Sequence, residues 1–248
     1  MRAEVAQGGK RRRLLNGGSC VALLTQLSAW LLVAGCAIPY VPYRTIYEDP
    51  VNYVRLEEDD AVLPEWPPGH HAHPTAFTVE QLTRLLNGMT VKEHRIWIQK
   101  WFQGEAPLVP VFKDEEVALL AHQLAEAFAT ANYNERVTFY LSQPQTSVKR
   151  VITSGGMYVH GDQLHVLLGN WQIVYGIPTY GMIYDRRYPM RPTAAKGFDL
   201  YFEPSDAVVK QRSSLWDTIF ANTKDELVID MNRWQASVTV RFSENHTP

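Results

Sequence analysis

The sequence predicts an α+β fold: one domain with N-terminal helices and a largely antiparallel sheet. Two patterns predict it. Apolar residues recur at helical spacing between residues 78 and 131, whereas from residue 137 onward short apolar runs alternate with polar residues, as they do in strands. The Gly161-Asp162 pair between two such runs favours a tight turn joining antiparallel neighbours. Roughly 165 residues from the first helix onward are enough for one hydrophobic core.

Two helices are expected in the first half of this region. One begins at Thr78, which forms a capping box with Gln81 three residues later. The other spans residues 114–131, with Asp114 as the expected N-cap and apolar side chains on one helical face. Between them, residues 91–102 fit either a strand or a short helix, and their periodicity does not decide between the two.

From residue 137 onward the sequence predicts mainly strands, and the turn at Gly161-Asp162 fixes the register of the two strands that it joins. The expected strands are residues 137–141, 157–160, 163–168, 198–202, 207–210, 226–231 and 238–242, with a short helix at 213–221. The two-residue turn places Val159 opposite Leu164 and Tyr158 opposite His165. One face of the hairpin is then buried (Met157, Val159, Leu164, Val166), and the other meets water or a partner (Tyr158, His160, Gln163, His165).

The N-terminus carries the pattern of an export signal. A basic cluster at residues 10–13 precedes a mostly apolar stretch at 21–34, which is short for a membrane span and typical of a signal-peptide core. It ends in Val33-Ala34-Gly35-Cys36. This motif resembles the lipobox of bacterial lipoproteins. The competing interpretation is an uncleaved signal anchor with an incidental cysteine.

The resemblance implies that residues 1–35 are a signal peptide, cleaved before Cys36, and that Cys36 carries a covalent lipid. It places the protein in the bacterial cell envelope, held to a membrane by its lipid. Because Ala37 follows the cysteine, the resemblance implies the outer membrane where the host has two membranes. Cys36 would then be the only cysteine left, since Cys20 leaves with the signal, and no disulfide is available.

Cleavage changes the charge balance. Removing residues 1–35 takes away five basic groups and one acidic group, which leaves 19 basic and 25 acidic groups and a net charge of −6. This balance argues against nucleic acid as a partner. Seven of the 15 prolines fall between residues 37 and 76. We therefore expect a lipidated, proline-rich tether over residues 36–77, although residues 53–56 also fit an edge strand of the domain.

Three histidines are the weak candidates for a metal site. His70, His71 and His73 lie close enough together to bind copper or zinc. However, no cysteine or acidic ligand stands at a fixed spacing from them, and a structural zinc site needs four ligands. The sequence therefore predicts no metal and no cofactor beyond the lipid on Cys36. His160 and His165 would supply only two ligands.

No catalytic motif is present in the sequence. It lacks G-x-S-x-G, H-E-x-x-H and a glycine-rich phosphate loop. We therefore expect a non-enzymatic accessory component that binds a protein partner in the envelope. Two alternatives remain open. One is a metal-binding lipoprotein that uses residues 70–73, and the other is a periplasmic hydrolase whose catalytic groups converge only in the fold.

Two groups of residues are candidates for partner contacts. Five tryptophans lie in the folded region, several of them beside predicted loops, and they indicate either a partner surface or ordinary packing: Trp97, Trp101, Trp171, Trp216 and Trp234. A basic cluster in the long loop of residues 176–197 fits either an anionic partner or a solvated loop: Arg186, Arg187 and Arg191. The sequence leaves both questions open.

Overall fold

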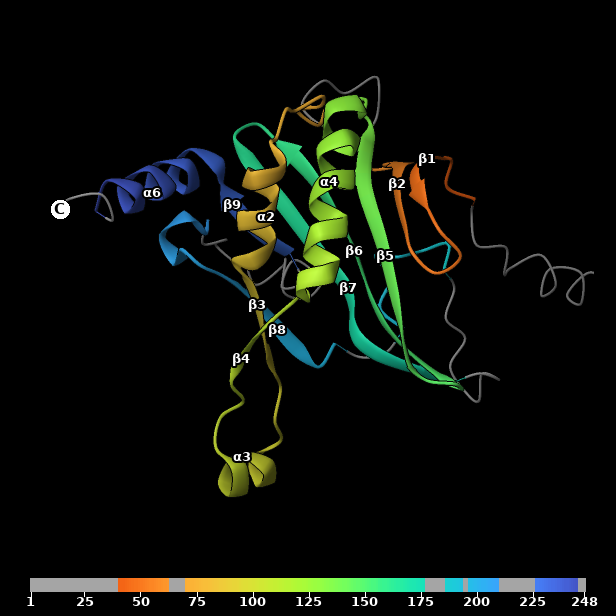
Figure 1. Cartoon of the computed structure of the whole chain (residues 1–248), viewed down its shortest axis with the longest axis vertical. Coiled ribbons are helices and arrows are strands. Elements are labelled where there is room, and N and C mark those ends of the chain that lie inside the picture. The colour runs from red at the N-terminus through yellow and green to blue at the C-terminus, as the bar shows by residue number, and fades with distance from the viewer. Residues whose placement is uncertain (1–39, 63–69, 177–185, 194–195, 210–225, 245–248) are drawn as a thin grey trace, which may run out of the picture. The chain divides into compact units, whose positions relative to one another are not determined.

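The computed structural model describes residues 40–62, 70–176, 186–193, 196–209 and 226–244. The chain divides after Tyr40, and the unit from Val41 onward contains the described elements (Figure 1). These elements form two antiparallel sheets, with helices packed on the larger one. The predicted α+β class is confirmed.

The larger sheet has six strands. Across the sheet they follow the order β1 (Tyr43–Glu48), β2 (Tyr53–Glu58), β5 (Glu135–Thr146), β6 (Lys149–His160), β7 (Gln163–Gly176) and β9 (Glu226–Asp230). Every neighbouring pair is antiparallel. A smaller sheet has the order β4 (Leu108–Pro110), β3 (Met89–Glu93) and β8 (Phe198–Phe202).

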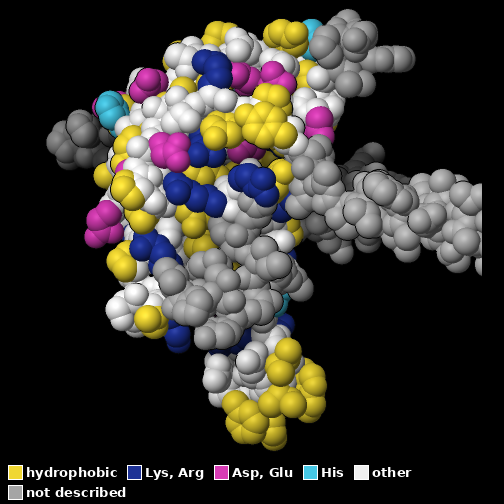
Figure 2. Space-filling view, turned by 90° about the vertical axis from the view of Figure 1, so that its right-hand side faces the viewer, with side chains coloured by type: hydrophobic (Ala, Val, Ile, Leu, Met, Phe, Trp, Pro, Cys, Tyr) yellow, Lys and Arg dark blue, Asp and Glu magenta, His cyan; other side chains and the backbone are white. Residues whose placement is uncertain are grey.

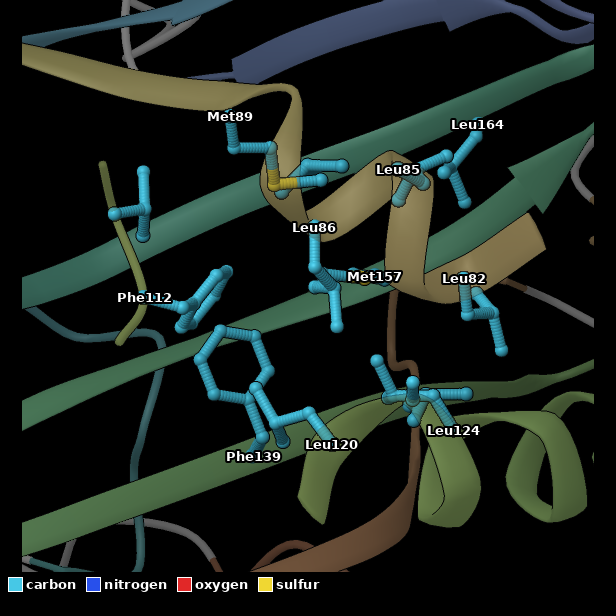
Figure 3. Close-up of a cluster of buried hydrophobic side chains, with 14 of the residues drawn as sticks. Leu82, Leu85, Leu86, Met89, Phe112, Leu120, Leu124, Phe139, Met157 and Leu164 are labelled. Carbon is cyan, nitrogen blue, oxygen red and sulfur yellow. The ribbon is translucent and has the colours of Figure 1, made fainter. Parts of the chain in front are cut away.

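Helices α2 (Val79–Asn87) and α4 (Asp114–Thr130) cover one face of the six-stranded sheet (Figure 1). The close-up in Figure 3 shows their leucines meeting side chains from the strands: Leu82, Leu85, Leu86, Leu120 and Leu124 lie against Phe139, Met157 and Leu164. All of these side chains are buried. Each contributes roughly 1.5–3 kcal/mol relative to leaving it exposed, so this face is the core of the domain.

The helix starts follow local hydrogen bonding. The predicted capping box at Thr78 is confirmed. Gln81 donates its backbone N–H to Thr78 Oγ1 at 3.2 Å, and Gln81 Oε1 accepts the Thr78 backbone N–H at 2.8 Å. In α4 the N-cap is Lys113 and not Asp114. Lys113 has an extended backbone, and its N–H donates to Glu116 Oε2 at 2.9 Å.

The hairpin of β6 and β7 has the predicted register. Val159 pairs with Leu164, and Tyr158 pairs with His165. The side chains expected on the inner face are buried: Met157, Val159, Leu164 and Val166. The prediction held because a register slip of one residue would turn this apolar set toward the opposite face.

The opposite face of the sheet is crossed by residues 186–193, which we call the strap. Its backbone carbonyls accept hydrogen bonds from Tyr53 Oη at 2.5 Å, from Ser154 Oγ at 2.7 Å and from Asn170 Nδ2 at 3.0 Å. The approach is close: a Cβ atom built on Gly169 would lie 2.6 Å from the carbonyl oxygen of Pro189. Glycine at position 169 is therefore what allows the strap to lie on the sheet.

The folded domain extends further toward the N-terminus than the boundary expected at residue 78. Strands β1 and β2 lie within the stretch expected as a tether, and β2 pairs with both β1 and β5. The reason is burial, since Tyr53, Val54 and Leu56 are at most 1 % exposed. Arg44 fixes the outer strand through an ion pair with Glu135 at 2.6 Å.

The C-terminal segment differs from its prediction. Residues 238–242 were expected as a strand, which is wrong, because they belong to α6 (Met231–Glu244). Asp230 Oδ1 accepts the backbone N–H of Arg233 at 3.0 Å, which is an N-cap pattern, and Trp234 anchors the first turns at 2 % exposure. The strand expected at 207–210 is reduced to one bridge, between Val208 and Ile229, after a 3-10 turn, η2 (Ser205–Ala207). The helix expected at 213–221 lies outside the described residues.

Candidate functional site

A projecting arm is the most exposed apolar feature of the described chain. We use the name arm for residues 92–108, which leave the small sheet along β3, form the helix α3 (Trp97–Gln103) and return along β4. In Figure 1 α3 lies at the far end of this excursion, away from α2, α4 and the six-stranded sheet. The segment that fitted either a strand or a helix therefore contains both, because β3 ends at Glu93 and α3 begins at Trp97.

Polar contacts within the arm hold α3 in place. Gln99 Oε1 accepts the Ile96 N–H at 3.2 Å at the start of the helix, and Gly104, in the left-handed region at φ 71°, closes its end. The guanidinium of Arg95 donates to the carbonyls of Gln103 and Gly104, both at 3.1 Å. A cation at this end of a helix also complements the helix dipole.

Two lysines converge on one carboxylate at the base of α3. Lys92 Nζ and Lys100 Nζ each lie 3.2 Å from an oxygen of Glu105. Their hydrogen bonds hold the pKa of Glu105 below its usual range. The carboxylate stays charged and is shared by two cations, while Glu93 and Asp199 add two further acids at the base of the arm.

The outer end of the arm is a cluster of exposed apolar side chains, which we call the apolar tip. Its members are Ile96 (61 % exposed), Trp97 (75 %), Ile98 (43 %), Trp101 (77 %) and Phe102 (75 %). The rings of Trp101 and Phe102 touch, with centroids 5.0 Å apart. Figure 2 shows the tip as a group of hydrophobic side chains at the end of the projection. No residue of α3 is buried.

The amphipathic pattern of α3 is inverted with respect to its own domain. At about 100° per residue, Trp97, Ile98, Trp101 and Phe102 span an arc of about 140°. The polar residues Gln99 and Gln103 instead line a cavity at the base of the arm. A surface helix normally turns its apolar face toward its own core. Here the polar side faces the domain, and the apolar side is left exposed.

The cavity at the base of the arm has a volume of about 430 Å³ and mixed walls. One wall comes from the arm, with Glu93, His94 and Arg95, and the other from residues 169–173 of β7 and 196–198. Asn170 is a buried polar residue in this wall, 1 % exposed. Its side-chain amide is hydrogen-bonded to Ser154, Arg191 and Thr193. Asn170 therefore fixes the strap and is not poised for chemistry.

Of the three candidate histidines, His71 and His73 are neighbours, with ring centroids 5.7 Å apart. His71 Nε2 lies 3.1 Å from Asp59 Oδ2, and Arg136 contacts the other oxygen of that carboxylate at 3.2 Å. His73 packs on Phe128, with ring centroids 5.6 Å apart, and His70 packs on Tyr133. Burial acts to raise the pKa of Asp59, but the hydrogen bond from His71 and the charge of Arg136 outweigh it and lower that pKa.

Within the described residues there is no group of three or more His, Cys, Asp or Glu side chains that could hold a metal ion. The expectation that residues 70–73 hold no structural metal stays a prediction. A large fall in melting temperature on adding a chelator would contradict it. His71 and His73 are 6 % and 8 % exposed, so alanine there should lower stability without any metal, through lost packing and through the lost contacts with Asp59 and the Val159 N–H.

The hairpin histidines occupy different positions. His160 is exposed, as predicted. His165 is mostly covered, because its Nδ1 lies 2.7 Å from Glu226 Oε1 and its ring stacks on Tyr158 with centroids 4.6 Å apart. The Tyr158 hydroxyl donates to the same Glu226 oxygen at 2.7 Å. Burial and this hydrogen bond raise the pKa of Tyr158. The face expected to be wet is thus partly closed by β9.

His73 should make the domain less stable in mild acid. Burial, followed by the nearby charge of His71, lowers the pKa of His73 from 6.5 to about 4. The folded state therefore resists a proton that the unfolded chain accepts below about pH 6.5. We expect up to about 3 kcal/mol of stability to be lost as the pH falls from 6.5 to 4, with no further loss from this group below pH 4.

Urea titrations at several pH values, comparing the wild type with His73→Phe, measure this effect. Phenylalanine keeps the ring against Phe128 but does not titrate. The difference between the two proteins isolates His73 from Glu57 and Glu116, whose pKa values are raised by burial and which act with the opposite sign. Parallel pH profiles for the two proteins would show that the His73 ring is not held neutral.

The three arginines of the basic cluster all lie in the strap, but their side chains have different environments. Arg186 lies 3.6 Å from Glu48 and stacks over the rings of Tyr53 and Tyr140, with its guanidinium carbon 5.2 Å from each centroid. Arg187 and Arg191 are exposed and lie over the ring of Tyr188. Arg186 therefore has a packing role, and the choice between an anionic partner and a solvated loop stays open for the two exposed arginines.

The sequence analysis included the two tryptophans of the tip among five candidates but did not distinguish them from the other three. Trp97 and Trp101 are exposed, whereas Trp171 and Trp234 are buried at 8 % and 2 %, and Trp216 lies outside the described residues. Ile96, Ile98 and Phe102 were missed as site residues. The signal that could have found them is the i, i+4 spacing of Trp97 and Trp101 just before Gly104.

The motif Val33-Ala34-Gly35-Cys36 lies outside the described residues. Among the residues that are described, no helix is long and apolar enough to cross a membrane. No protein-family model matches the chain, no curated protein matches it, and no solved structure matches it. Function therefore has to be argued from the chain itself.

Proposed function

We propose that this chain is a membrane-anchored lipoprotein of the bacterial cell envelope, and that its folded domain acts by docking through the arm. The observation that carries the proposal is the apolar tip, where three aromatic rings at least 75 % exposed stand on the outward side of α3. The motif ending in Cys36 supports the anchor. The inverted orientation of α3 supports docking, since the tip has no contact with the core of its own domain.

The size of the tip fits a docking role. A fully covered aromatic side chain buries about 150–250 Å². Covering the exposed parts of Trp97, Trp101 and Phe102 would therefore withdraw roughly 400 Å² from water, a gross gain of about 10 kcal/mol at about 25 cal/mol per Å². Association costs take back much of this gain. The remainder is enough for reversible docking, particularly for a protein already held at its site by a lipid.

The anchor is tested at the cysteine. In cells grown with labelled fatty acid, Cys36→Ser should abolish the label and leave the chain larger by the uncleaved residues 1–35. Cys20→Ser is the matched control and should change neither, because Cys20 precedes the expected cleavage site. A Cys36→Ser protein that keeps its label and its mass would refute the anchor.

The docking role is tested by crosslinking in intact cells. A photoreactive benzoylphenylalanine at position 101 of the full chain should form adducts on illumination, because the partner lies against the tip. The same group at Tyr201, which is 42 % exposed on the strand β8, is the control and should give few. Equal yields from the two positions would refute docking through the arm.

A further inference from the structure

We infer that the partner of the apolar tip is a lipid surface, namely the interfacial layer of the bilayer that holds the Cys36 anchor. The inference rests on the proposed docking function and identifies the partner of the same site. Three properties of the arm support it: the shape of the tip, its aromatic chemistry and the charge around it.

The shape of the tip suits a bilayer. Four of its five side chains stand on one seven-residue helix at the end of a two-stranded projection, and the fifth, Ile96, is the N-cap of that helix, so they form a small convex wedge (Figure 2). A convex wedge needs either a matching protein groove or a medium that deforms around it. The headgroup layer of a bilayer is such a medium, and it accepts helices that place tryptophan and phenylalanine on one face and polar residues on the other.

The side-chain chemistry points to the interfacial depth. Tryptophan, whose ring is apolar and whose N–H needs a polar partner, concentrates at the level of the headgroups. Trp97 and Trp101 stand one helical turn apart and are about equally exposed, at 75 % and 77 %. Ile98 and Phe102 continue the same face. Two indoles at one level, with purely apolar side chains beside them, match the boundary between headgroups and acyl chains.

The charge around the tip complements an anionic membrane. Lys92, Arg95 and Lys100 lie within the arm, against the acids Glu93 and Glu105, and both lysines contact Glu105. Residues 36–248 as a whole carry a net charge of −6. The arm itself has three basic and two acidic groups, a net charge of +1, so an anionic surface repels the arm less than the rest of the protein.

The expected anchor keeps the folded domain near this surface. The folded unit begins at Val41, five residues after Cys36, and five extended residues span about 18 Å at most. A lipid on Cys36 therefore holds the domain beside the membrane. Insertion of the tip is then an intramolecular event at a high effective concentration, for which a modest affinity is sufficient.

Quenching by brominated lipid tests the inference on the full chain. The acylated protein is purified from membranes and reconstituted into vesicles of phosphatidylethanolamine and phosphatidylglycerol, with or without lipids brominated at carbons 6 and 7. We expect bromine to quench tryptophan emission in the wild type. Trp97→Phe with Trp101→Phe keeps the tip apolar but removes its reporters, and should remove at least half of the lipid-dependent quenching.

A second pair of variants tests insertion while keeping the reporters. Ile98→Glu with Phe102→Glu places two charges on the apolar face and should reduce the quenching of the remaining tryptophans at least twofold. Val148→Glu with Tyr201→Glu is the control, because it places the same two charges at positions 54 % and 42 % exposed outside the arm, and should leave quenching unchanged. Neither pair touches the core, so melting temperatures should match the wild type.

The outcomes separate the two proposals. Protein that floats with the vesicles but shows no quenching at the tip overturns the lipid inference alone. Benzoylphenylalanine at position 101 that captures protein and no phospholipid does the same and leaves docking intact. Acylated protein that fails to float with the vesicles overturns the anchor itself. Quenching that survives both Trp→Phe changes shows that a different part of the chain meets the lipid.

Discussion

Replacing Val159 with aspartate is expected to unfold the domain. Val159 is 1 % exposed on β6 and lies opposite Leu164 in the core, and its carbonyl accepts the Ala72 N–H at 2.7 Å. The side chains around it are apolar apart from the buried ring of His73, whose Nε2 accepts the Val159 N–H at 3.4 Å and whose lowered pKa keeps it neutral at pH 7. Burying an unpaired charge or forcing its neutralisation costs about 5 kcal/mol or more, a large part of the whole stability of a domain.

The neighbouring residue provides the control. His160→Asp places the same group one position further along the strand, where the side chain is exposed, and should change stability by no more than about 0.5 kcal/mol. Urea unfolding followed by circular dichroism compares the two variants. If Val159→Asp unfolded at the wild-type midpoint while His160→Asp did not, the inner and outer faces of the hairpin would be exchanged.

Gly155→Ala is expected to cost about 3 kcal/mol, although it adds only one carbon. A Cβ atom at this position would lie 2.3 Å from the carbonyl oxygen of Leu167 and 3.0 Å from Phe139 Cζ. The first neighbour is backbone, held by the β6–β7 ladder, and the second is a core ring that is 0 % exposed. Neither can yield without opening a strand pair or displacing the core, so the cost lies at the upper end for overpacking.

Gly197→Ala is the matched control, because nothing lies within 4 Å of the added carbon there and its backbone φ is ordinary. Its melting temperature should stay within a degree or two of the wild type. A Gly155→Ala protein as stable as Gly197→Ala would mean that the strands around Gly155 are not in the register described.

The hairpin shows what the sequence predicts well. Its register follows from a two-residue turn and from alternation, both of which are local, and the structure has it residue by residue. The Thr78 capping box is local in the same sense. The prediction of a strand at residues 238–242 was wrong because the alternating β-branched residues Val238 and Val240 resemble a strand. The N-cap at Asp230 and the burial of Trp234 instead favour a helix.

The candidate site was less predictable because exposure is a tertiary property. Trp97 and Trp171 look alike in the sequence, and only the fold shows that one stands on the arm while the other donates its ring N–H to the Val111 carbonyl at 3.3 Å. The partners of the histidines are equally non-local. Asp59 and Glu226 come from opposite ends of the domain sequence, and no spacing links either of them to a histidine.

Strands β1 and β2 are synthesised first but complete their pairing late. Arg44 and Glu135, whose ion pair joins β1 to the start of β5, are 91 residues apart in the chain. Until β5 leaves the ribosome, β2 presents an unpaired edge and the side chains of Tyr53, Val54 and Leu56 have no core to cover them. A loop of this length closes slowly, and sheets built from distant pairs fold slowly. Until β5 pairs with β2, this unpaired edge and these apolar side chains therefore expose the chain to aggregation.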